Sequence, residues 1–92
     1  MIALRLVIRG RVQGVGYRYS MIDAATARGV TGWVCNRRDD SVEAFVQGEA
    51  AAVEAIVSWC RRGPPAAKVE GVEAFPAATD FTIADFSHRP TP

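Results

Sequence analysis

The sequence predicts an α+β domain with the ferredoxin-like split βαβ plan, in which two helices cover one face of an antiparallel sheet. Several short segments alternate apolar and polar residues at a period of two, as strands with one buried face do. Two other segments repeat their apolar residues at helical spacing, and glycine, proline or polar residues separate the segments. The resulting order is β-α-β-β-α-β followed by a late edge strand. At 92 residues the chain is long enough for one such domain, spanning residues 1–92.

A strand and then a helix are predicted at the start of the chain. The apolar residues of this strand occupy every second position: Ile2, Leu4, Leu6 and Ile8. Residues 17–28 favour a helix, because small and unbranched side chains dominate there and Gly29 follows as a C-terminal cap. One face of this helix is expected to be buried: Tyr17, Met21, Ala24 and Ala25.

A hairpin, a second helix and two further strands complete the prediction. Residues 30–36 and 42–47 are β-rich, and the polar segment 37–41 between them is typical of a turn. Residues 50–62 show helical spacing and end before a Gly-Pro-Pro sequence. The apolar residues at that spacing are Val53, Ile56, Val57 and Cys60. Apolar and polar residues alternate again in residues 69–75, which predicts a strand, and a short final strand is predicted over 81–86. Residues 87–92 are expected to form a loose tail.

Composition and charge exclude several classes of protein. Hydrophobic residues make up 49% of the chain and charged residues 23%, which is typical of globular and not of disordered proteins. A net charge of +1 argues against a surface devoted to nonspecific binding of polyanions. No apolar run approaches the roughly 18 residues of a membrane span, and arginines interrupt the apolar start where a signal peptide needs an unbroken run. We therefore expect a cytoplasmic protein that binds neither membranes nor nucleic acid. A monomer is expected, because nothing in the sequence resembles a heptad seam or a long apolar edge.

The two cysteines predict neither a metal site nor a disulfide framework. Cys35 and Cys60 form no CxxC motif and have no histidine nearby in the sequence, so no metal or other cofactor is expected. Trp33 and Cys35 alternate with Val34, which places them on the sheet face that no helix covers. Cys35 is therefore not expected to meet Cys60.

The segment 10–16, between the first strand and the first helix, has three glycines in seven residues. Consecutive N–H groups in such a turn form a nest for an anion, and Arg18 in the first helical turn can grip phosphate oxygens with two parallel hydrogen bonds. Tyr19 occupies the position of the third glycine of a dinucleotide fingerprint, and the Gly-Lys of a P-loop is absent, so the segment argues against nucleotide binding. The spacing of the glycines is equally consistent with a tight strand-to-helix connection that binds no anion and leaves the Arg18 side chain in solvent.

The predicted topology brings this loop close to Asn36. The first two strands run parallel on either side of the third, so their C-terminal ends lie at one edge of the sheet, two strand spacings or about 10 Å apart. An amide at this edge can accept a hydrogen bond from water and hold that water beside a bound phosphate. Taken by itself, Asn36 is more simply a turn residue at the end of a strand.

These residues lie in two blocks that closely resemble the signatures of the acylphosphatase family. The first block is GRVQGVGYR at residues 10–18, and the second begins with GWVCN at residues 32–36. Further similar positions, spread over nearly the whole chain, are Ser41-Val42-Glu43, Gly48, Trp59, Gly63-Pro64-Pro65 and Phe81-Thr82-Ile83. The family usually has glycine in the hairpin turn where this chain has Asp40. This difference affects the expected conformation of the turn and not the expected site. Aspartate tolerates a positive φ better than most residues.

The resemblance implies a cofactor-free, metal-independent hydrolase that cleaves the carboxyl–phosphate bond of acyl phosphates and releases inorganic phosphate. It implies two catalytic residues, Arg18 holding the phosphoryl group and Asn36 positioning the attacking water. The implied phosphate-binding loop consists of Gln13, Gly14, Val15, Gly16 and Tyr17. A general base is not required, because the carboxylate leaves readily and phosphoryl transition states are loose. His88 is accordingly predicted to be a solvated residue of the tail.

Two other functions remain open at the level of sequence. A phosphate-binding module that does not turn over its ligand would share this fold and this loop. A ferredoxin-like sheet with Trp33, Phe45, Arg5 and Arg9 on its open face would also suit RNA, because aromatic side chains stack on bases. Against RNA binding, the third strand lacks the RNP-type pattern of a basic residue, glycine and an aromatic.

Overall fold

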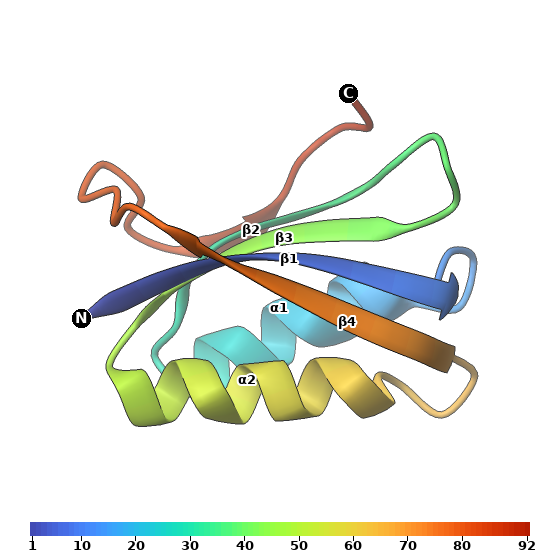
Figure 1. The fold of residues 1–92 in the computed structure, drawn as a ribbon, viewed down its shortest axis with the longest axis horizontal. Helices are drawn as coiled ribbons and strands as arrows, with labels where there is room; N and C mark the ends of the chain where they lie inside the picture. The colour runs from blue at the N-terminus through green and yellow to red at the C-terminus, as the bar shows by residue number, and fades with distance from the viewer.

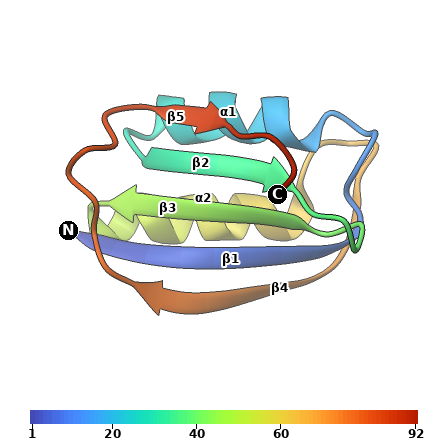
Figure 2. The ribbon, with the colours of Figure 1, turned by 90° about the horizontal axis from the view of Figure 1, so that it is seen from above.

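Five strands and two helices make up the fold, and their order agrees with the prediction. The computed structural model describes residues 1–92. The elements are β1 (Ile2–Arg11), α1 (Tyr17–Ala27), β2 (Thr31–Asn36), β3 (Val42–Gly48), α2 (Ala50–Arg62), β4 (Lys68–Ala77) and β5 (Phe86–His88). All five strands belong to one sheet in the order β4-β1-β3-β2-β5 (Figure 2).

The pairing of the central strands determines which loops meet. β3 lies between β1 and β2 and is antiparallel to both, so β1 and β2 run parallel to each other. Ile8 of β1 and Asn36 of β2 are both paired with Val42 of β3, on its two sides. The chain therefore leaves β1 and β2 at the same edge of the sheet, as the sequence predicted.

The last strand differs from its prediction in position and direction. β5 begins at Phe86, and it pairs in parallel with β2, so the sheet is mixed and not wholly antiparallel. Residues 81–85 are not a strand, because the carboxylate of Asp80 accepts hydrogen bonds from the N–H and the hydroxyl of Thr82 and turns the chain. Phe81 is 82% exposed, whereas Phe86 is buried. His88, which we expected in a loose tail, is the last residue of β5.

Both helices pack on one face of the sheet (Figure 1). The buried residues of α1 are the predicted four, and α2 buries Val53, Ile56 and Cys60. These side chains meet apolar residues of the sheet in one core cluster, including Leu6, Ile8, Val34, Val42, Ala44 and Val46. The hydroxyl of Tyr17 donates a hydrogen bond of 2.7 Å to the carbonyl of Cys60, which joins α1 to α2. Neither helix is long and apolar enough to cross a membrane.

The opposite face of the sheet carries the side chains that alternate with the core residues. Trp33 and Phe45 are cross-strand neighbours with ring centroids 6.3 Å apart, and Arg89 lies 4.9 Å from the centre of the Trp33 ring. Cys35 is buried but lies outside the core cluster that contains Cys60, and both thiols are free. The prediction that the two cysteines do not meet is therefore confirmed.

The turn between β2 and β3 contains the departure from the family pattern, and it supports a prediction about stability. Asp40 has a φ of 71°, a left-handed conformation that costs L-residues energy and glycine almost none. The side chain of Asp40 makes no hydrogen bond or ion pair, whereas that of Asp39 accepts a hydrogen bond from the N–H of Ser41. We expect Asp40→Gly to raise the free energy of unfolding by up to about 1 kcal/mol and to leave turnover unchanged. Chemical denaturation measures this, and a loss of stability would contradict it.

Candidate functional site

A cavity of about 210 Å³ lies between the end of β2 and the segment that connects β1 to α1. Its lining residues are Val12, Gly14, Gly16, Tyr17, Arg18, Tyr19 and Asn36. The structure thus brings Arg18, Asn36 and three of the five predicted loop residues around one cavity. Gln13 and Val15, the other two loop residues, do not line it.

The loop presents backbone N–H groups that have no partner in the protein. Gly14 and Gly16 have φ values of 73° and 77°, and a Cβ at either position would meet open space, so conformation and not crowding requires glycine there. No backbone N–H of residues 13–16 donates a hydrogen bond. Gly16 is also the N-cap of α1, which has neither a capping side chain nor an acidic residue in its first turn. Free N–H groups and the positive end of the helix dipole therefore coincide, as in anion-binding nests.

Arg18 lies in the first turn of α1 and is half-buried. Its guanidinium makes no hydrogen bond and no ion pair within the protein. Arg5 and Arg9, in contrast, are paired with Glu43 at 3.2 Å and Glu73 at 3.0 Å. The planar fork of Arg18 is therefore available to bind an anion through two hydrogen bonds.

Asn36, the last residue of β2, reaches the cavity from the other side. Its amide oxygen is buried and has no hydrogen-bond partner. A buried acceptor without a partner costs about 1–3 kcal/mol, and groups of this kind are typical of functional sites. No protein group ties the amide to one orientation, so the side chain is able to turn its oxygen toward a bound water.

The remaining side chains of the predicted loop have structural roles. Val15 packs against the core, and Tyr17 is 1% exposed, with its hydroxyl bonded to Cys60. Burial raises the pKa of Tyr17, so its phenol stays neutral. Gln13 donates hydrogen bonds to the turn between β2 and β3. If residues 13, 15 and 17 bind phosphate, they do so through backbone N–H groups.

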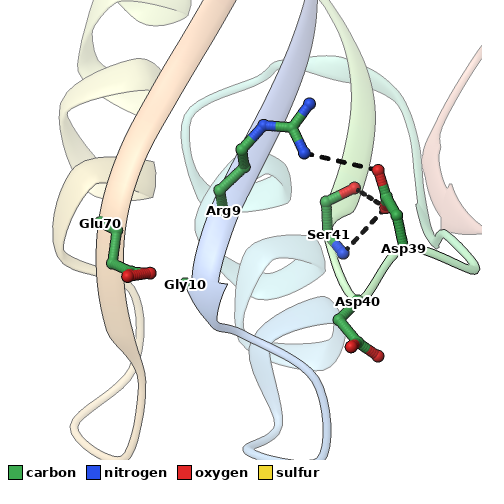
Figure 3. A pocket seen from close by; sticks show the side chains of 6 residues that line it. All are labelled: Arg9, Gly10, Asp39, Asp40, Ser41 and Glu70. Atoms are coloured by element: carbon green, nitrogen blue, oxygen red, sulfur yellow. Dashed lines mark hydrogen bonds and ion pairs between the residues drawn. The ribbon is translucent and has the colours of Figure 1, made fainter.

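A second cavity, of about 260 Å³, lies beside the turn and has the opposite electrostatic character (Figure 3). Three carboxylates line it, those of Asp39, Asp40 and Glu70, and Arg9 faces Asp39 at 3.4 Å. Hydrogen bonds from Ser41 lower the pKa of Asp39 to about 2, so this carboxylate is charged at neutral pH. An anion is therefore repelled here, whereas the cavity beside Arg18 has no carboxylate in its lining.

Sequence reasoning missed two aromatic side chains near the Arg18 cavity. Tyr19 lines the cavity and is 65% exposed, and its ring lies 5.6 Å from that of His88 in an edge-on contact. No local signal predicts this contact, because it depends on the parallel pairing of β5 with β2. His88 itself does not line the cavity. No group of three or more His, Cys, Asp or Glu side chains is arranged to hold a metal ion.

Comparison with known proteins gives matches over almost the whole chain. Residues 4–88 match the family model described as acylphosphatase. The acylphosphatase of Albidiferax ferrireducens is 56% identical over 80 residues, which are 87% of this chain and 87% of that protein. Acylphosphatase 1 of Ralstonia nicotianae is 51% identical over 89 residues, 95% of this chain and 87% of that protein. The crystal structure of the acylphosphatase from Bacillus subtilis matches with a TM-score of 0.92 at 34% identity and covers 97% of this chain and 99% of that one.

Proposed function

This chain belongs to the acylphosphatase family, and we propose that it hydrolyses acyl phosphates to a carboxylate and inorganic phosphate in the cavity beside Arg18. One observation carries the proposal. Backbone N–H groups without internal partners, an unpaired arginine and an amide without a fixed orientation surround the same cavity. Hydrolysis of a phosphoryl compound needs these parts: donors for the phosphoryl oxygens and an acceptor for the attacking water.

The phosphoryl group is held by the loop and by Arg18. Its oxygens accept hydrogen bonds from backbone N–H groups of the loop, where Gly14 and Gly16 line the cavity, and from the guanidinium. These donors are already in position before the substrate binds, and the helix dipole adds positive potential at the same point. The negative charge that spreads over the equatorial oxygens in the transition state is thereby stabilised.

Asn36 orients the water that attacks phosphorus. Its amide oxygen accepts a hydrogen bond from the water, whose own oxygen is then directed at phosphorus, in line with the bond that breaks. The carboxylate departs with the electron pair of that bond and needs no proton, and the protons of the attacking water stay on the inorganic phosphate or pass to solvent. The cavity lining has no carboxylate or histidine that could act as a general base, which is consistent with catalysis by positioning.

The first test is a turnover assay with benzoyl phosphate or acetyl phosphate. We expect equal rates with and without EDTA, because Arg18 and the loop N–H groups supply the positive charge that a metal ion would bring. We also expect poor hydrolysis of ordinary phosphate monoesters. Activity that EDTA abolishes and Mg²⁺ restores would contradict the metal-independent mechanism. Binding of inorganic phosphate without any turnover would favour the non-catalytic module.

The RNA-binding alternative has less support than hydrolysis. Phe45 is only 9% exposed, one side of Trp33 is covered by Arg89, and Arg5 is engaged by Glu43 and Phe75. The groups available for stacking bases and binding phosphates on this face are therefore largely occupied.

The proposed site is complete within one chain, in accord with a monomer. The free thiols of Cys35 and Cys60 suit the reducing environment of the cytoplasm.

A further inference from the structure

Gln13 connects the loop on one side of the cavity with the end of β2 on the other side. Its side-chain amide nitrogen donates to the carbonyl of Arg37 at 2.8 Å and to the carbonyl of Ser41 at 2.9 Å. Both hydrogens of the amide are thus used, and the acceptors stand at the two ends of the β2–β3 turn. The N–H of Arg37 also donates to the carbonyl of Ser41, at 2.8 Å, which closes the turn. Gln13 therefore fastens the loop to the residue that directly follows Asn36.

No other hydrogen bond joins the loop to the β2–β3 turn, since the contact of Arg9 with Asp39, at 3.4 Å, comes from β1. Residues 12–16 lie beyond the last paired residue of β1, and the only backbone bond that involves them runs from Ser20 to Gly16 inside the first turn of α1. β3 separates β1 from β2, so the sheet itself does not join the loop directly to Asn36. The two bonds of Gln13 are the hydrogen bonds that hold the phosphate loop against the strand end with Asn36.

We propose that Gln13 is a positioning residue that sets the separation between the loop N–H groups and Asn36, and so the alignment of the attacking water with a bound phosphoryl group. This inference rests on the proposed function. Because misplacement of reacting groups by about 1 Å can cost 10²-fold in rate, loss of this connection should lower kcat. Phosphate affinity should be largely kept, because the N–H groups and Arg18 remain.

Gln13→Met tests the proposal, because methionine has similar length and no hydrogen-bond donor. We expect kcat for benzoyl phosphate to fall about 10- to 100-fold, while the dissociation constant of inorganic phosphate changes less than about 3-fold. Gln47→Met is a matched control. Gln47 also makes two side-chain bonds, both of 2.8 Å to the backbone of Asp80, but it pairs with Ala3 and Thr31 at the far end of the sheet. This control should lower the Tm and leave kcat unchanged.

A double-mutant cycle shows whether Gln13 acts through Asn36. In an Asn36→Ala background, Gln13→Met should reduce the residual kcat less than about 3-fold, because the oriented water is already lost. An unchanged kcat in the single variant, a loss of phosphate affinity as large as the loss of kcat, or fully additive effects would each overturn the proposal. If Gln13→Met does not fold, Gln13→Ala at this half-exposed position replaces it. Failure of the wild-type protein to hydrolyse benzoyl phosphate would instead contradict the proposed function.

Discussion

Replacing Arg18 by lysine or alanine is expected to leave the protein folded and to remove nearly all turnover, on the order of 10³-fold or more, the scale of arginines that stabilise phosphoryl transfer. Stability should be kept because the guanidinium has no partner within the protein and the side chain is half-buried. Lysine should fail as alanine does, since a single ammonium cannot donate two parallel hydrogen bonds to a phosphoryl group. Inhibition by inorganic phosphate should be lost together with turnover.

The assay compares kcat/KM for benzoyl phosphate and the inhibition constant of phosphate in the wild type and both variants, with circular dichroism to verify the fold. Arg28→Lys is a suitable control, because Arg28 follows the other end of the same helix and its side chain donates a hydrogen bond only to the carbonyl of Ala24. That control should keep full activity. If Arg18→Lys retains most of the wild-type activity and phosphate affinity, Arg18 does not hold the phosphoryl group through two parallel hydrogen bonds.

Asn36→Ala is expected to reduce turnover about 10²- to 10³-fold, the usual scale for one preorganised polar group. Phosphate should still inhibit this variant, because Arg18 and the loop N–H groups remain. Asn36→Asp should stay inactive: it keeps the shape and an acceptor, but it brings a negative charge toward the phosphoryl oxygens. Wild-type levels of turnover in Asn36→Asp would mean that shape alone is sufficient at this position.

The pH dependence of the rate tests the same mechanism without changing the site. The proposed mechanism uses an amide and a guanidinium, and neither kind of group serves as a proton donor or acceptor in it, so the rate at saturating substrate should be flat from pH 5 to 8. The contact of His88 with Tyr19 makes His88→Ala the informative comparison. A rate that rises with pH in the wild type and becomes flat in His88→Ala would identify a general base and contradict positioning by Asn36.

Most of the fold could be read from short stretches of sequence. The buried face of α1, the apolar spacing of α2 and the alternation in β1 each reflect a period that the local backbone geometry imposes. The order of those elements then determined which strand ends meet, and hence that Arg18 and Asn36 come together. The last strand was misplaced because the hydrogen bonds of Asp80 to Thr82 and to Gln47 outweigh the β-propensity of residues 81–83.

Sequence patterns predict the type and order of the elements from β1 to β4 and, through two short blocks, the family and the residues proposed to act on phosphate. The parallel pairing of β5 with β2, the contact of His88 with Tyr19 and the hydrogen bonds of Gln13 to the turn beside Asn36 are visible only in the folded chain. The difference has a physical origin. Periodicity and turn chemistry act over a few residues, whereas the partners of Gln13 lie 24 and 28 positions away, and such contacts exist only after the sheet has brought separate segments together.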